Sequence, residues 1–282
     1  MPEPKIEPTT LSEGCAAPAA VTVVNEAGTS PVVLICEHAS NHIPGAYAGL
    51  GLAPEHLVRH IAWDIGAAAL ARRLSALLDA PLFLSGYSRL LIDCNRPAGV
   101  PSSIPLRSED TDIPGNLDLS AEEVARRTAL CFTPFQEAIA RHLDARTAAG
   151  RETEIVGVHS FTPVFLGERR RWHAGVLHGN ALNGGADALA RRLLDGLGRE
   201  PDLVVGDNEP YAVGPTSDYT VPVHGIARGL PAALIEVRND LICDEAGVET
   251  WARRLAGVLA GMPAGHGATP GSGIGGMTEG AA

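Results

Sequence analysis

The sequence lacks the features that would place this chain in a membrane or outside the cell. No apolar run approaches the roughly 20 residues that a membrane-spanning helix needs. The N-terminal segment MPEPKIEPTTLSEG has neither a basic region nor an apolar stretch, so we expect no signal peptide. The five cysteines are odd in number and contain no C-x-x-C pair, which favours reduced thiols over a disulfide framework. These absences together predict a soluble cytoplasmic protein.

Positive charge is also scarce. The chain has 22 Lys and Arg against 33 Asp and Glu, a formal net charge of −11. This balance argues against nucleic acid or an anionic membrane as a partner, although a local arginine pocket could still bind a small acidic substrate. The first apolar strand is not followed by G-x-G-x-x-G or a P-loop, and H-E-x-x-H is absent, which disfavours a nucleotide site and a helix-borne zinc site.

What the sequence does contain is an alternation of short apolar runs and amphipathic segments. We expect strands at about 31–38, 80–86, 90–94, 154–160, 174–178, 203–207 and 232–240. Helices are expected at about 54–60, 65–78, 120–149, 185–197, 217–228 and 245–261. This alternation predicts an α/β fold with three α/β/α layers and a mostly parallel, mixed sheet. We expect a disordered arm at 1–20, one α/β domain at 21–262 and a disordered tail at 263–282, while the oligomeric state stays open.

Several of the predicted strands end in reactive side chains. These ends are Glu37-His38, the segment 93–96, His159-Ser160 and the segment 236–240. Because the carboxyl ends of parallel strands meet at one edge of a sheet, these groups should converge there. Histidine and carboxylate are the ligands that bind zinc in proteins. The spacing alone is a weak signal, since an isolated histidine is more often structural than a ligand.

Four short motifs strengthen the case. They are EHASNHIP at 37–44, SRLLIDCNRP at 88–97, VHSFTP at 158–163 and IEVRNDL at 235–241. Their order resembles that of the N-formylglutamate amidohydrolase family, and 63–64, 112–116 and 173–177 are also similar to it. The resemblance covers roughly residues 31 to 260. It implies the fold of zinc carboxypeptidases and aspartoacylases, one Zn²⁺ per chain, and a small N-acyl amino acid as substrate.

The resemblance also implies roles for individual residues. His38 and His159 would bind zinc, and Glu236 would carry the proton between water and the leaving amine. Asn95 and Arg96 would clamp a substrate carboxylate. Further contacts to the substrate or the oxyanion are expected from Arg89, Arg238 and His224, and the sequence does not decide whether Arg89 or Arg238 binds a second carboxylate. Glu236 and Arg238 could instead form a same-face ion pair, being two apart on one strand.

The sequence leaves two candidates for the third zinc ligand. Zinc carboxypeptidases use His-x-x-Glu on the first strand, whereas here Asn41 stands three residues after His38. Asp64 is the candidate, because relatives often have Trp-His where this chain has Trp63-Asp64. Glu37 is the rival, although its neighbour His38 should point to the opposite face. Asp64 could also simply cap the helix that follows it.

Three functions are compatible with these residues. The first is a zinc-dependent amidohydrolase that releases formate from N-formyl-L-glutamate. The second keeps the fold and metal but acts on another N-acyl amino acid or on a C-terminal peptide residue. The third is a non-catalytic carboxylate-binding protein, which the presence of a candidate general base at Glu236 disfavours.

Overall fold

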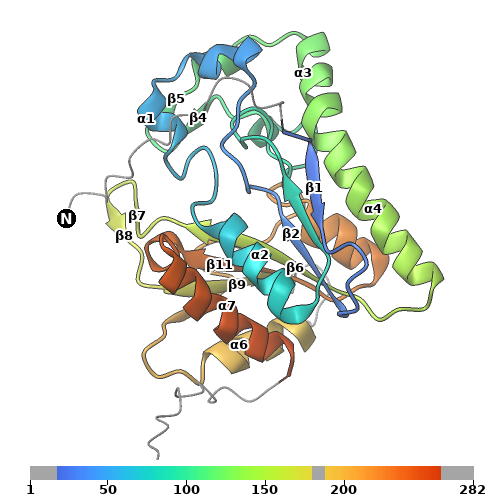
Figure 1. Cartoon of the computed structure of the whole chain (residues 1–282). Helices are drawn as coiled ribbons and strands as arrows, with labels where there is room; N and C mark the ends of the chain where they lie inside the picture. The colour runs from blue at the N-terminus through green and yellow to red at the C-terminus, as the bar shows by residue number, and fades with distance from the viewer. Residues whose placement is uncertain (1–17, 180–187, 262–282) are drawn as a thin grey trace, which may run out of the picture.

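A seven-stranded sheet runs through the middle of the protein (Figure 1). The structure is a computed structural model that describes residues 18–179 and 188–261. In spatial order the strands are β1 (Val21–Val24), β3 (Leu82–Ser85), β2 (Val32–Cys36), β6 (Glu154–Phe161), β11 (Ala232–Arg238), β9 (Ala174–His178) and β10 (Val205–Asp207). Most of the expected arm and all of the expected tail beyond 262 lie outside the described residues, as does the start of the helix expected at 185.

The strand directions confirm a mixed, mostly parallel sheet. Strands β3, β2, β6 and β11 run parallel to one another. The edge strand β1 is antiparallel to β3, and β9 is antiparallel to β11 and parallel to β10. The three strands β2, β6 and β11 therefore end at the same edge of the sheet, whereas β9 and β10 end at the opposite edge.

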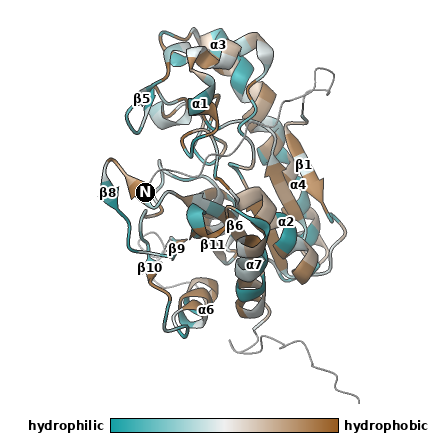
Figure 2. Cartoon of the chain, turned by 60° about the vertical axis from the view of Figure 1, so that its left-hand side comes forward, coloured by the Kyte–Doolittle hydropathy of each residue, from teal (hydrophilic) through white to brown (hydrophobic). Residues whose placement is uncertain are grey.

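Helices cover both faces of the sheet. One face packs against α2 (Ala67–Leu78), α6 (Ala188–Leu197) and α7 (Glu245–Leu259), and the other against α4 (Thr133–Ala148), which α3 (Ala121–Arg127) precedes in the chain. Strand β2 shows why both faces must be covered, since Leu34 belongs to the core under α2 and its neighbour Ile35 to the core under α4. Helices α2 and α7 carry both hydrophobic and hydrophilic residues (Figure 2). The predicted three-layer α/β/α arrangement is thus confirmed.

The long helix expected at 120–149 is interrupted. A π-helical turn, Thr128–Phe132, lies between α3 and α4, and the backbone N–H of Thr133 reaches back to the carbonyl of Thr128. The next residue, Pro134, has no N–H for the regular bond to residue 130, which explains why the helix widens here. At the start of α3, Ser120 accepts a hydrogen bond from the backbone N–H of Glu123, at 3.3 Å.

The strand expected at 90–94 was a wrong prediction. Residues 88–96 form turns, and their apolar side chains are buried beneath α4 rather than in the sheet. Side chains take the place of a neighbouring strand: Asn116 donates to the carbonyl of Leu90, and Arg127 donates to the carbonyl of Leu91. A short apolar run has the same composition in either setting, so its sequence could not separate the two.

Other short elements also differ from expectation. The helix expected at 217–228 begins later, as a π turn, Thr220–Gly225, followed by a 3-10 turn, Ile226–Arg228. The helix expected at 54–60 is the single turn α1 (Pro54–Leu57). Edge strand β1 was missed, as were two hairpins, β4 (Arg107–Ser108) with β5 (Thr111–Asp112), and β7 (Val164–Phe165) with β8 (Glu168–Arg169).

The sequence predicted neither a membrane-spanning helix nor a disulfide framework, and the described residues bear on both predictions. None of the helices within 18–179 and 188–261 combines the length and apolarity that crossing a membrane requires. The cysteines of the described part of the chain, Cys36, Cys94, Cys131 and Cys243, are all free thiols.

Candidate metal and active site

Three adjacent strands bring the predicted site residues together. His38 follows the end of β2, His159 lies near the end of β6, and Glu236 near the end of β11. His159 and Glu236 face each other as partners in the β6–β11 register. The convergence expected from the strand ends is therefore present, and His38, His159 and Glu236 all line one cavity.

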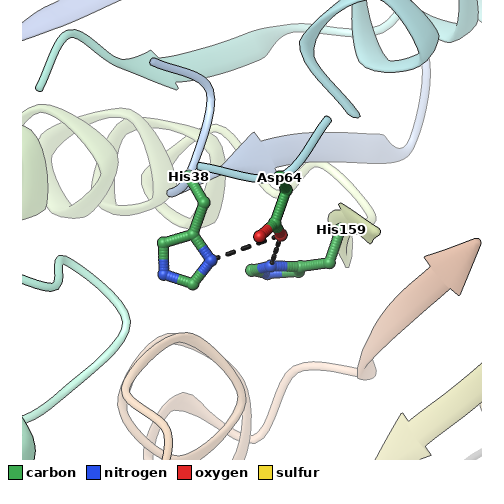
Figure 3. A group of neighbouring side chains, drawn as sticks. All are labelled: His38, Asp64 and His159. Atoms are coloured by element: carbon green, nitrogen blue, oxygen red, sulfur yellow. Dashed lines mark hydrogen bonds and ion pairs between the residues drawn. The ribbon is translucent and has the colours of Figure 1, made fainter. Parts of the chain in front are cut away.

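Asp64 completes a group of three donors (Figure 3). Its Oδ2 lies 3.3 Å from Nδ1 of His38 and 2.8 Å from Nδ1 of His159. One ligand atom from each residue can be chosen so that all lie within 4.8 Å of one another, and all three side chains are buried. Two imidazoles and one carboxylate that leave a position open are the donor set of catalytic zinc sites. The residues fit a bound metal ion.

The chain turns sharply after Asp64, which directs this side chain into the site. Gly66 has φ +82°, and a Cβ there would lie 2.3 Å from the backbone oxygen of Ile242. The helix-cap alternative for Asp64 was wrong, because α2 begins after Gly66 and has no side-chain cap. The carboxylate of Asp64 instead faces the two histidines and accepts from the backbone N–H of Ser160, at 3.3 Å.

Both histidines have a second carboxylate on the ring nitrogen that points away from Asp64. Nε2 of His38 lies 2.7 Å from Oδ1 of Asp93. Nε2 of His159 lies 3.1 Å from Oε2 of Glu37, a close charge contact whose direction falls outside hydrogen-bond geometry. Carboxylates in this position fix the tautomer and orientation of metal-binding imidazoles. Glu37 thus lies beside Nε2 of His159 and is not one of the three grouped donors.

Glu37 is itself held from a distant part of the chain. The hydroxyl of Thr220 donates a short hydrogen bond to its Oε1. Burial alone would raise the pKa of Glu37, but the His159 ring and the hydrogen bonds outweigh it and lower the pKa. In the same way, burial disfavours a charged His159, yet Glu37 and Asp64 raise its pKa. A metal ion that binds here must displace a proton.

The side chain of Glu236 is buried, and one of its carboxylate oxygens can accept a proton. Its Oε2 has no hydrogen-bond partner among the described residues. Burial raises the pKa of Glu236 to about 7, against the opposing charge of His159. The alternative ion pair between Glu236 and Arg238 does not form, since Arg238 Nε donates to Asp240 instead, at 2.8 Å. A buried carboxyl group with a pKa near neutrality has the properties of a general base.

The cavity above these groups has a volume of about 330 Å³. The sequence-predicted residues that line it are His38, Asp64, Arg89, Asn95, Arg96, His159 and Glu236. Two other hollows in the described surface, of about 390 and 480 Å³, are more open to solvent and contain none of these residues. The chemistry predicted from the sequence is therefore concentrated in one place.

Arg89 and Asn95 are occupied mainly with other protein groups. Arg89 Nη2 lies 2.8 Å from Asp93 and its Nη1 lies 3.5 Å from Asp64, so the guanidinium holds two acidic residues beside the site. Asn95 Oδ1 accepts from the backbone N–H groups of Tyr219 and Thr220, at 3.0 and 3.1 Å. Asn95 thus holds the segment whose Thr220 contacts Glu37.

Arg96 is less committed. Its Nη1 donates to the backbone oxygen of Asn95, at 3.1 Å, and it forms no ion pair within the described residues. Its remaining N–H donors can bind a carboxylate in the cavity.

Two predicted substrate-binding residues are not part of the cavity lining. His224 is buried on the α4 side of the sheet, where its Nε2 lies 2.7 Å from Oε1 of Gln136. Burial lowers the pKa of His224 to about 4, which keeps the ring neutral. Arg238 pairs with Asp240 and donates to the backbone oxygen of Trp172, at 3.4 Å. The structure does not bring either residue to the other site residues.

Sequence reasoning missed several residues that shape the site. Asp93 lies in the motif SRLLIDCNRP, two residues before Asn95. This position was the available sequence signal for a role beside the metal ligands. Thr220 and Glu37 are 183 positions apart in the sequence, and no local pattern could have paired them. Asp218, which also lines the cavity, was missed as well.

Comparison with known proteins agrees with this geometry. The family model described as N-formylglutamate amidohydrolase matches residues 30–243, which is most of the chain. The chain belongs to the N-formylglutamate amidohydrolase family. It is accordingly a hydrolase that acts on a linear amide bond, and the buried group of His38, Asp64 and His159 in its cavity could hold a metal ion.

Solved structures show the same fold. A gene product of Agrobacterium tumefaciens is 40% identical, with a TM-score of 0.82 over 87% of this chain and 95% of that one. An N-formylglutamate amidohydrolase from Ralstonia eutropha is 20% identical, with a TM-score of 0.66 over 86% of this chain and 96% of that one, a likeness in fold alone. Among curated proteins, none matches the chain significantly.

Proposed function

We propose that this protein is a zinc-dependent amidohydrolase that converts N-formyl-L-glutamate and water to L-glutamate and formate. The observation that supports it most is a buried His-Asp-His donor set beside the carboxyl group of Glu236, whose Oε2 has no hydrogen-bond partner within the described part of the chain. A pure carboxylate-binding protein has no use for a buried general base in this position. Membership of the family supports the choice of substrate.

His38, Asp64 and His159 would hold the metal ion. Zinc in this position would supply Lewis-acid polarisation of the formyl carbonyl and make a water molecule more acidic. Asp93 and Glu37 hold the two imidazole rings so that both Nδ1 atoms face Asp64. The chain therefore arranges its donors before any ligand binds.

Glu236 moves the proton. As the water oxygen forms its bond to the formyl carbon, Oε2 of Glu236 accepts the proton that the water loses. The C–N bond then breaks, and Glu236 gives the proton to the departing amine, so that glutamate leaves as an amine and formate as the acid. Arg89, held by Asp64 and Asp93, would place positive charge near the developing oxyanion. Arg96 would bind a carboxylate of the substrate and fix its orientation.

The test joins metal content to product formation. Purified protein is analysed for bound metal and assayed for formate release from N-formyl-L-glutamate, before and after treatment with a chelator. We expect about one zinc per chain and formate release that the chelator abolishes and added zinc restores. Zinc without formate release would redirect the search to other N-acyl amino acids. Failure to bind metal after reconstitution would contradict the proposal.

A further inference from the structure

The proposed substrate has two carboxylates, and the cavity lining provides for only one. Among the described residues, the guanidinium groups in the lining are those of Arg89 and Arg96. Arg89 is paired with Asp64 and Asp93, and in the proposed function it serves the oxyanion rather than a carboxylate. Arg96 can bind one carboxylate, and Arg238, the other arginine expected from the sequence, pairs with Asp240 outside the cavity. A second cation must come from the edge of the cavity if a dicarboxylate is to be favoured.

Arg170 is placed to be that cation. Its guanidinium lies over the rings of Phe161, Phe165 and Tyr211, at 5.8, 4.6 and 4.8 Å from their centroids. All three rings belong to residues that line the cavity. The side chain forms no ion pair with any carboxylate of the described residues and is half-buried, whereas its neighbours Arg169 and Arg171 are exposed. Stacking on rings holds the guanidinium in place without using its N–H donors.

Tyr211 adds a hydrogen-bond donor beside Arg170 at the edge of the cavity. Arg170 Nη1 donates to the Tyr211 hydroxyl oxygen, at 2.8 Å. Because the oxygen accepts this bond, the phenolic proton remains available for donation to a ligand. The pair therefore offers a guanidinium and a hydroxyl together, which is suited to a carboxylate.

The backbone around Arg170 is fixed at both ends of the β7–β8 hairpin. At its base, the N–H of Arg170 donates to the carbonyl of Pro163, at 2.9 Å. At its tip, the N–H of Leu166 donates to Oε1 of Glu109, at 3.2 Å, and Oε2 of Glu109 pairs with Arg59 at 2.7 Å. The hairpin is thereby fastened to the β4–β5 hairpin on the same side of the molecule (Figure 1). A fixed guanidinium loses little freedom when it binds an anion.

We propose that Arg170 and Tyr211 form a subsite for the second carboxylate of the substrate, while Arg96 binds the first. The proposal rests on the proposed function and specifies its substrate class, an N-acyl amino acid with an acidic side chain. The subsite selects the dicarboxylate over neutral analogues of the same size.

The kinetic test compares N-formyl-L-glutamate with N-formyl-L-glutamine, which has nearly the same shape but a neutral side chain. In Arg170→Gln, KM for N-formyl-L-glutamate should rise about 10- to 100-fold, the range for a lost charge-assisted hydrogen bond, with kcat little changed. Values for N-formyl-L-glutamine should stay as in the wild type. Arg170→Lys, which keeps the charge, should recover part of the preference, and Arg171→Gln should match the wild type with both substrates. Equal effects on both substrates would overturn the subsite.

Binding of non-reacting ligands separates this proposal from the proposed function. Glutarate and butyrate are titrated calorimetrically into the zinc-reconstituted wild type and into Arg170→Gln. We expect glutarate to bind the wild type more tightly than butyrate, and Arg170→Gln to remove that difference. If glutarate binds the wild type and Arg170→Gln equally, or binds neither protein, the subsite is overturned even if formate is released. Glutarate binding that depends on Arg170, without any formate release, keeps the subsite and rejects the proposed reaction.

Discussion

At the scale of single residues, the site assigns different work to carboxylates that look alike in the sequence. Asp64 faces both Nδ1 atoms of the histidines, Glu37 and Asp93 face the Nε2 atoms, and Glu236 has no hydrogen-bond partner within the described residues. Their different surroundings decide their roles, because the same functional group can act as ligand, support or base.

Replacing Glu236 with glutamine should remove turnover and leave the rest of the site intact. Glu236→Gln keeps the shape of the side chain but cannot accept a proton, so we expect kcat to fall by about 10²- to 10⁴-fold. Bound zinc, measured by elemental analysis, should be unchanged because the residue lies outside the donor set. A variant with near-normal kcat would show that another group accepts the proton.

Replacing Glu37 tests the support behind His159. Glu37→Gln removes the charge that faces Nε2, and the affinity for zinc should fall by about 10- to 100-fold. Competition with a chromophoric chelator measures this directly, without an activity assay. Glu26→Gln, a change at an exposed site of the same residue type, serves as the control. Equal zinc affinity in both variants would mean that Glu37 does not orient the ring.

At the scale of elements, the residues at strand ends were predictable and the connections were not. The sequence indicated β2, β6 and β11 with their site residues, because a buried parallel strand is a nearly continuous apolar run followed by polar groups. The segment 90–94 carried the same apolar pattern and was mistaken for a strand. The hydrogen bonds that replace a neighbouring strand come from Asn116 and Arg127, which lie 26 and 36 residues beyond their acceptors in sequence.

The substrate-facing residues show the same limit. Arg96 could be predicted from its motif, but His224 and Arg238 could not be excluded from the sequence, because the partners that occupy them are Gln136 and Asp240. Arg170 stands in a run of three arginines, and nothing in the sequence distinguishes it from Arg169 and Arg171. Only the fold places it over three rings.

The C-terminal end of α2 supplies a prediction about pH. Asp79 follows the helix with φ +51°, and its carboxylate accepts from the hydroxyl and backbone N–H of Thr29 and from Asn25. The bonds to Thr29 and Asn25 lower its pKa to about 2. A lowered pKa stabilises the fold above the unfolded value of about 3.9, and this contribution is lost as the pH falls through about 2.

Asp79→Asn keeps the shape of the side chain, and asparagine also tolerates the left-handed backbone conformation. The substitution therefore removes only the negative charge. Denaturant unfolding should show the variant less stable than the wild type at pH 7 and pH 5, with the difference shrinking between pH 4 and pH 2. Asp118→Asn, at an exposed position with φ +48°, should behave as the wild type throughout. A difference that does not change with pH would mean that the charge is not responsible.

At the scale of the whole molecule, the metal ligands connect segments that are distant in the chain. His38, Asp64 and His159 come from the turn after β2, the turn before α2, and β6. A metal that binds the folded chain only should stabilise it by about 2.7 kcal/mol when free zinc is 100 times its Kd. For a protein of this size we expect Tm to rise by about 5–10 °C.

Differential scanning calorimetry with zinc and with a chelator measures this shift. His159→Ala should abolish it by removing a ligand, whereas His173→Ala, outside the donor set, should retain it. A zinc-dependent shift that persists in His159→Ala would place the metal elsewhere in the protein.

The reversal of β9 relative to β11 has a consequence for how this scaffold can change. Since β9 begins at the edge where β6 ends, the chain at 162–173 passes from one to the other without crossing a face of the sheet. The β7–β8 hairpin and Arg170 both belong to this passage, so its length and composition can vary while the layers stay as they are. This segment can therefore be replaced as a unit during evolution. Grafting residues 162–173 from a relative should transfer that relative's preference for the amino acid side chain of the substrate, while the metal ligands and Glu236 stay in place.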